Sequence, residues 1–183
     1  MTDFMLDLET MGRNPGCAIM QIGACQFDRK TGEIGKTLLV NVDLHDCVTK
    51  GFVIDPSTLY WWMGQSDSAR KSVIADPRLS IRMALLEYVN LFDGLDKNSI
   101  NVWCHATFDL PILHTAMNKL EIRTPYHYAA GKDIRTAVEL AGINGRDAIK
   151  LFPREGEHHT ALDDCKHQVK YLVHCLNRIQ LVD

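Results

Sequence analysis

The N-terminal part of the chain contains three segments rich in apolar residues, a pattern typical of β-strands. They are residues 4–9, 18–27 and 34–42, and the polar residues 28–32 between the last two, Asp-Arg-Lys-Thr-Gly, are typical of a hairpin turn. Strands joined by short turns pair in antiparallel fashion, so the pattern predicts an antiparallel meander.

Helical spacing of apolar residues dominates the remainder of the chain. Apolar side chains recur every three to four positions in residues 80–92, 110–120 and 132–141, and a strand-like run at 99–104 separates the first two of these helices. Asp55 and Pro56 are typical of the cap and first turn of a short helix, and the last periodic segment opens at His159. The pattern predicts an α/β fold in which a mixed sheet, the meander plus parallel strands, is flanked by helices.

Length and composition favour a single domain over residues 1–183. A chain of 183 residues that is 46% hydrophobic can bury one core, and no Pro/Gly/Ser-rich linker divides it. No apolar run approaches the roughly 20 residues that cross a bilayer, and the N-terminus enters a strand without a signal peptide. We therefore expect no membrane partner and a cytoplasmic location. The six cysteines show no Cys-x-x-Cys spacing, so we expect reduced core thiols.

Two acids, Asp7 and Glu9, lie two positions apart within the first apolar segment. Alternate residues of a strand point to the same side, so the two carboxylates should converge. Like charges this close raise one another's pKa unless a cation lies between them, which indicates half of a Mg²⁺ or Mn²⁺ site. The alternative is an edge strand whose acids are solvated.

Two later acidic positions have contexts that complete such a site. Asp109 lies where a strand-like run passes into a helical pattern, and it could equally be a helix N-terminal charge that complements the dipole. His159 and Asp164 lie five residues apart on the predicted last helix, near enough to serve one reaction centre. That pair could also be a solvated helix start.

With its acids and histidine in this order, the chain resembles the DEDDh exonucleases, which are 3′ to 5′ nucleases with an RNase H-like fold. The resemblance covers essentially the whole chain and rests on Asp7, Glu9, Asp109, His159 and Asp164. Residues 59–65 and 133–136 are similar to the branch that contains a mycobacterial 3′ to 5′ exoribonuclease and phage exonucleases of the DexA type.

This resemblance implies two Mg²⁺ or Mn²⁺ ions as cofactors, with four carboxylates as ligands. Asp7 bridges both ions, Glu9 and Asp164 complete the ion that carries the attacking water, and Asp109 supports the second ion. His159 takes the proton of the water, because imidazole titrates near neutral pH. We choose His159 over His158 because the His-x-Ala-x-x-Asp spacing fits residues 159–164.

The implied reaction releases nucleoside 5′-monophosphates from the 3′ end of single-stranded RNA or DNA, or from a 3′ overhang. Adjacent residues of a helix point about 100° apart, so one of Trp61 and Trp62 can be core while the other stacks on a base. We cannot assign which one from the sequence. The predicted substrate contacts are Thr10, Met11, Trp61, Trp62, Gln65, Phe108 and Arg135.

Three features of the sequence bear on this interpretation. Many family members carry Asn where this chain has His105, which is either a substrate contact or a satisfied structural histidine. A net charge of −3 is unusual for a nucleic-acid binder, although bound metals would neutralise several acids. Local cations that could form a groove are Arg13, Arg70, Lys71, Arg123, Lys132, Arg135 and Arg146.

The alternative function is a noncatalytic module on the same fold that binds nucleic-acid ends. Such a module would be expected to have lost a metal ligand or the histidine, and this chain retains all of them. We leave open a homodimer.

Overall fold

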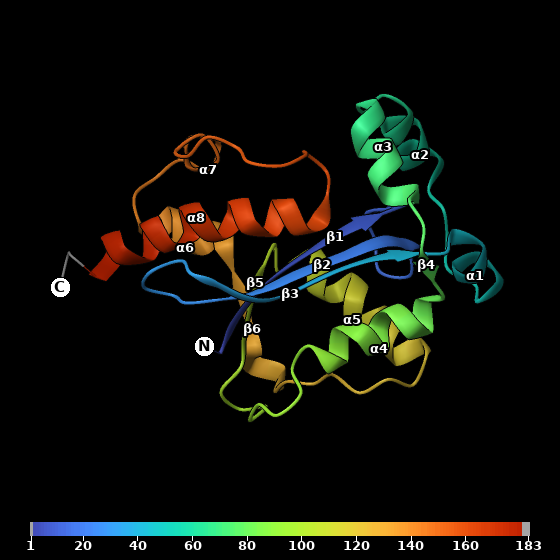
Figure 1. Ribbon diagram of the computed structural model, residues 1–183, viewed down its shortest axis with the longest axis horizontal. Coiled ribbons are helices and arrows are strands. Elements are labelled where there is room, and N and C mark those ends of the chain that lie inside the picture. The colour runs from blue at the N-terminus through green and yellow to red at the C-terminus, as the bar shows by residue number, and fades with distance from the viewer. Residues whose placement is uncertain (1, 181–183) are drawn as a thin grey trace.

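A six-stranded mixed sheet forms the centre of the computed structural model, which describes residues 2–180 (Figure 1). The strand order is β4-β3-β2-β1-β5-β6. Strand β2 pairs antiparallel with β1 and with β3, which confirms the predicted meander, and the remaining pairs are parallel. The strands are β1 (Asp3–Thr10), β2 (Ile19–Phe27), β3 (Ile34–Val42), β4 (Arg78–Leu79), β5 (Asn101–Cys104) and β6 (Gly131–Asp133).

Helices pack on both faces of the sheet, as the predicted α/β fold requires. One face is covered by α6 (Ile134–Leu140) and α8 (Ala161–Gln180), and the other by α4 (Ile81–Asn90) and α5 (Asp109–Lys119) (Figure 1). A separate lobe at one end of the sheet holds α2 (Pro56–Met63) and α3 (Asp67–Ile74). The shorter helices are α1 (Leu44–Thr49), the 3₁₀ turn η1 (Tyr128–Ala130) and α7 (Gly145–Ala148).

Strand β1 lies in the interior of the sheet, and every one of its residues is buried. Phe4 and Leu6 belong to the core under α4 and α5, whereas Met5 belongs to the core under α6 and α8. Strand alternation therefore places Asp7 and Glu9 on the α8 side of the sheet. The alternative of an edge strand with solvated acids is wrong.

Several helix boundaries differ from those that the sequence predicts. The helix expected at 132–141 begins at Ile134, because the preceding residues pair with β5 and Asp133 caps the helix. The last helix begins at Ala161, so the prediction that His159 lies on it is wrong. Helices α1, α3 and α7 are too short for apolar periodicity to reveal them, and α7 lies in a polar stretch.

The start of α8 packs directly on β2 at Gly23. A Cβ atom at that position would lie 2.3 Å from the carbonyl carbon of Ala161, so only glycine permits the approach. The Gln21 Oε1 atom accepts the Ala161 N–H at 2.7 Å, and the Cys165 thiol donates to the Gly23 carbonyl at 3.3 Å. These contacts fix the first turn of α8 beside β1 and β2.

All six cysteines are free and buried, as expected for reduced core thiols. Burial raises the pKa of the Cys47 thiol to about 12, so this side chain is protonated and unreactive at neutral pH. Within residues 2–180, no helix combines the length and the apolar character needed to cross a membrane.

Candidate active site

Four buried or half-buried carboxylates meet where β1 passes under the start of α8. One oxygen from each of Asp7, Glu9 and Asp164 lies within 4.8 Å of the others. Asp109 begins α5 on the other side of β1, and its carboxylate accepts the Leu8 N–H at 3.3 Å and the His105 N–H at 2.9 Å. The acids that the sequence singles out are therefore brought together from β1, α5 and α8.

Burial raises the pKa values of Asp7, Glu9 and Asp109, and repulsion between carboxylates adds to the shifts of Asp7 and Glu9. Burial, followed by the charges of Asp109 and Glu9, raises the pKa of Asp7 well above its ordinary value. Burial and Asp109 raise the pKa of Glu9 to about 8, and burial raises the pKa of Asp109 to about 7. A hard divalent cation bound by carboxylate oxygens would remove this penalty, so the residues present fit Mg²⁺ or Mn²⁺.

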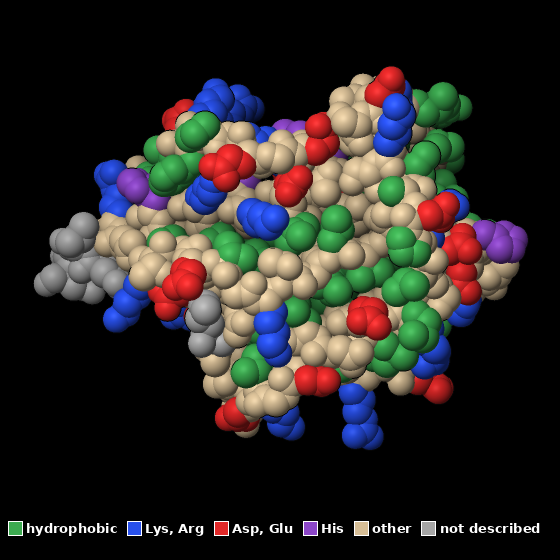
Figure 2. Space-filling view, in the orientation of Figure 1, with side chains coloured by type: hydrophobic (Ala, Val, Ile, Leu, Met, Phe, Trp, Pro, Cys, Tyr) green, Lys and Arg blue, Asp and Glu red, His purple; other side chains and the backbone are tan. Residues whose placement is uncertain are grey.

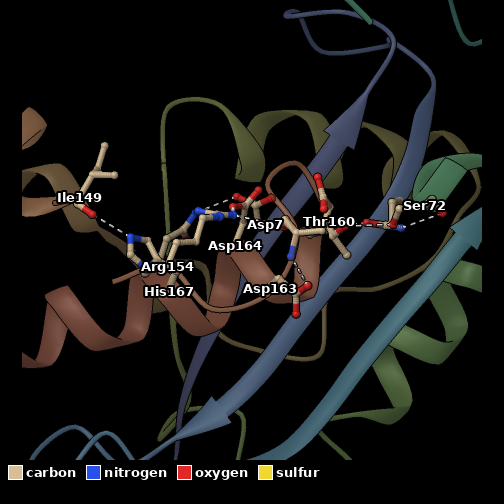
Figure 3. Close-up of polar contacts among 12 residues, drawn as sticks. Asp7, Ser72, Ile149, Arg154, Thr160, Asp163, Asp164 and His167 are labelled. Carbon is tan, nitrogen blue, oxygen red and sulfur yellow. Dashed lines mark hydrogen bonds and ion pairs between the residues drawn. The ribbon is translucent and has the colours of Figure 1, made fainter. Parts of the chain in front are cut away.

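Arg154 supplies positive charge at the edge of this cluster. Its guanidinium forms an ion pair with Asp164 and donates to the Glu157 carbonyl at 3.4 Å (Figure 3). No sequence pattern marks this arginine, because it lies in an aperiodic polar segment between α7 and α8. The structure thus places a protein cation against a carboxylate that the sequence assigns to a metal.

Gln168 contacts the carboxylate of Asp7 from α8. Its Nε2 donates to Asp7 Oδ1 at 2.8 Å, and the side chain is buried. It lies one helical turn beyond Asp164, so the helical period places both side chains on the same face toward β1. The four-residue spacing from Asp164 could have indicated Gln168 from the sequence, although Gln168 is not one of the motif residues.

The segment before α8 is tied to both α3 and α8. The Glu157 carboxylate accepts a hydrogen bond from the Ser66 hydroxyl at 3.1 Å, and the Glu157 N–H donates to Asp163 Oδ2 at 2.9 Å. The Thr160 hydroxyl bonds to that of Ser72 at 3.0 Å (Figure 3). The Asp163 carboxylate therefore holds this segment against the first turn of α8.

His159 lies between the carboxylates and the α2 lobe. Its backbone is left-handed, with φ of 63°, and its ring contacts Trp61 edge-on with 4.9 Å between centroids. Burial, with smaller contributions from His158 and Arg154, lowers the pKa of His159 to about 4, so the imidazole is neutral at neutral pH. Figure 2 shows histidine side chains in the hollow between the lobe with α7 and the lobe with α2 and α3.

A pocket of about 490 Å³ opens beside Glu9, and the two tryptophans that line it differ in how far they are exposed. Trp62 is only 4% exposed and its indole N–H donates to the Thr10 carbonyl at 3.0 Å, whereas Trp61 is 46% exposed. Phe108 also lines this pocket. Trp61 is therefore the tryptophan that can stack on a base.

The remaining predicted substrate contacts are distributed over two places. Thr10 lines the pocket of Trp61, whereas Met11 is buried in the core and Gln65 bonds to the Trp61 carbonyl at 3.0 Å. Neither Met11 nor Gln65 is among the residues that line the pocket.

A second hollow, of about 570 Å³, is lined by His105, Arg135 and Arg146. The Arg135 guanidinium donates to the Thr107 hydroxyl at 3.2 Å. The other predicted cations do not share this hollow. Arg13 lines the Trp61 pocket, Arg70 pairs with Asp67, and Arg123 lines a pocket elsewhere. Lysines and arginines are scattered among acids on the face seen in Figure 2.

We expect the metal-free protein to become less stable as the pH rises from about 5 to about 8. The pKa of Glu9 is raised to about 8 in the folded chain. A glutamate in the unfolded chain titrates near 4.3, so in this window the unfolded chain binds fewer protons and higher pH favours it. Mg²⁺ should therefore raise Tm more at pH 8 than at pH 5.

Thermal melts in EDTA and in Mg²⁺ across this pH range measure both effects. The control is Glu9→Gln, which cannot ionise and should weaken the pH dependence in EDTA. A metal-free Tm that rises steadily from pH 5 to pH 8 would contradict the expectation.

The chain is similar in sequence to known exonucleases. Residues 2–176 match the family described as the 3′-5′ exoribonuclease Rv2179c-like domain. The exodeoxyribonuclease of Enterobacteria phage T4 is 27% identical over 215 residues, covering 96% of this chain and 89% of the phage protein.

Solved structures with this fold are more distant in sequence. The nuclease domain of 3′hExo, a DEDDh family member bound to rAMP, has a TM-score of 0.64 at 12% identity, covering 96% of this chain and 91% of that one. E. coli exonuclease I with a bound oligonucleotide has a TM-score of 0.65 at 15% identity, covering 98% of this chain and 42% of that one. The likenesses confirm the predicted RNase H-like sheet.

Proposed function

Because the chain belongs to the Rv2179c-like 3′-5′ exoribonuclease family and is a 3′ to 5′ exonuclease, we propose that its buried carboxylates hold the metal ions of hydrolysis. Asp7, Glu9 and Asp164 would bind one Mg²⁺ or Mn²⁺, and Asp7 with Asp109 a second. When bound, such a pair supplies a nucleophilic water and neutralises charge on the phosphate and the leaving oxygen. The observation that carries the proposal is the convergence of buried carboxylates whose pKa values are raised.

His159 serves as the general base in this proposal. Its low pKa keeps the imidazole neutral, so the ring can accept the proton of the attacking water. The residue lies beside Asp164, in a segment that Glu157 and Thr160 anchor to α3. This anchoring holds the base near the carboxylates without placing it on a helix.

The terminal nucleotide would enter the pocket of Trp61, which Phe108 also lines. Glu9 lines the same pocket, so a base on the Trp61 indole leaves its phosphate at the carboxylates. A pocket closed by α2 on one side accepts a strand end rather than the middle of a strand. The upstream strand would leave toward the hollow with Arg135 and Arg146, whose guanidinium groups suit phosphate oxygens.

Replacing Trp61 with alanine should weaken oligonucleotide binding by roughly 1 to 3 kcal/mol, with little dependence on the base, because stacking uses only the π face. The matched change Trp62→Ala should instead lower the free energy of unfolding by about 3 to 5 kcal/mol, because that indole is core. Binding titrations in an Asp7→Asn background and denaturant melts separate the two effects. Equal binding by Trp61→Ala and the parent would remove stacking from the proposal.

A time course on single-stranded RNA and DNA of one sequence, each labelled at the 5′ end, tests the function. We expect a ladder that shortens one nucleotide at a time, in Mg²⁺ and in Mn²⁺ but not in EDTA. The same assay measures the sugar preference, which depends on contacts to the 2′-hydroxyl. Binding of these strands without any hydrolysis would favour the noncatalytic module instead.

A further inference from the structure

His158, His159 and Asp164 form a second group of metal-ligating atoms next to the carboxylate cluster. One imidazole nitrogen from each histidine and one oxygen of Asp164 lie within 4.8 Å of one another. The two imidazole rings are 4.1 Å apart between centroids. His158 is exposed and the other two are half-buried, so an ion in solution can reach the group.

The donor atoms of this group differ in kind from those around Asp7. Two imidazoles and a carboxylate are ligands that Zn²⁺ accepts in a tetrahedral site with an open fourth position, whereas Mg²⁺ prefers oxygen. Bonds of about 2.0 to 2.2 Å place tetrahedral ligands roughly 3.3 to 3.6 Å apart. Rotation of the exposed His158 side chain and of the Asp164 carboxylate can close the difference while α8 stays in place.

We propose that His158, His159 and Asp164 bind a transition-metal ion of the Zn²⁺ class, and that this ion inhibits the enzyme. The inhibition rests on the proposed function, because the ion would take Asp164 from the catalytic metals and the nitrogen of His159 from the attacking water. The ion also replaces Arg154 as the partner of Asp164. Binding of the ion itself does not depend on the function.

Local structure holds two of the ligands close to the positions that the ion needs. His159 has a left-handed backbone and packs edge-on against Trp61, and the flanking Glu157 and Thr160 are hydrogen-bonded to α3. Asp164 lies in the first turn of α8, which Gly23 fixes on the sheet. His158 is the ligand outside the catalytic set, so its removal tests the site without touching that set.

Co²⁺ added to the protein in excess Mg²⁺ is the direct test, since Co²⁺ reports imidazole ligation by its visible absorption. We expect the visible band in the parent and in His45→Ala, a matched exposed histidine on α1, and its loss in His158→Ala and His158→Gln. A near-ultraviolet thiolate band should be absent because the cysteines are buried. An unchanged band in both His158 variants would overturn the site.

Zn²⁺ inhibition measured in excess Mg²⁺ tests the consequence. Both His158 variants should need at least about tenfold more Zn²⁺ for half inhibition, since loss of a ligand weakens a metal site by at least as much as loss of an outer-shell partner. Equal Zn²⁺ sensitivity of parent and variants would overturn the inhibition. A protein that shows the His158-dependent band but no hydrolysis in any metal would retain the site and refute only the proposed function.

Discussion

Asp7→Asn should fold normally and lose hydrolysis by about 10³-fold or more. Asparagine keeps an oxygen that accepts the Gln168 hydrogen bond, so the local packing is preserved. It lacks the charge that would bridge the two ions, and the loss of several kcal/mol of transition-state stabilisation corresponds to this factor. Single-turnover rates on a 5′-labelled strand in saturating Mg²⁺ measure the effect.

The control for Asp7→Asn is Asp93→Ala, which changes an exposed acid remote from the cluster and should leave the rate unchanged. Mn²⁺ binding followed by electron paramagnetic resonance should also weaken in Asp7→Asn but not in the control. An active Asp7→Asn enzyme in Mg²⁺ would remove the bridging carboxylate from the mechanism, whatever the state of the other ligands.

His159→Ala should slow the chemical step by about 100-fold or more, the range typical of a lost general base. His158→Ala should have a mild effect in Mg²⁺, since that ring is exposed and lies outside the proposed catalytic set. Because the pKa of His159 is lowered to about 4, the neutral imidazole persists from pH 5 upward. Nearby metal cations favour the neutral ring further.

Rates of the parent enzyme from pH 5 to pH 8 should therefore show no step from this histidine, and the loss in His159→Ala should be similar throughout. A larger loss in His158→Ala than in His159→Ala would mean that the neighbouring imidazole is the base.

The convergence of Asp7 and Glu9 could be predicted from the sequence because it depends only on the two-residue repeat of a strand. The meander and the helices α4 and α5 were predictable for the same reason, since each of these elements follows from the regular spacing of its own apolar residues. The role of each tryptophan was not, because it depends on how α2 meets the end of β1. Trp62 is buried in the core, where its indole N–H donates to the Thr10 carbonyl.

The position of Arg154 and the backbone of His159 were equally beyond sequence reasoning. Both lie in an aperiodic segment whose path is fixed by single contacts to distant parts of the chain, such as the bond of Glu157 to Ser66. The four-residue spacing of Asp164 and Gln168 predicts that both side chains lie on one face of the helix. The sequence does not show that this face packs against β1, because that contact depends on the assembled sheet.

The packing of α8 on Gly23 has a consequence for how the chain reaches its native state. The hydrogen bond between Gln21 and Ala161 beside this contact joins residues that are 140 positions apart in the sequence. The bond between Gln168 and Asp7 joins residues that are 161 positions apart. Closing loops of this length costs entropy that is recovered only when the contacts form, so such contacts slow folding. Carboxylates from β1 and α8 meet only after this closure. During refolding, nuclease activity should therefore return together with the docking of α8 and later than the signal from the N-terminal hairpins, which makes catalysis a kinetic probe of the longest-range step in folding.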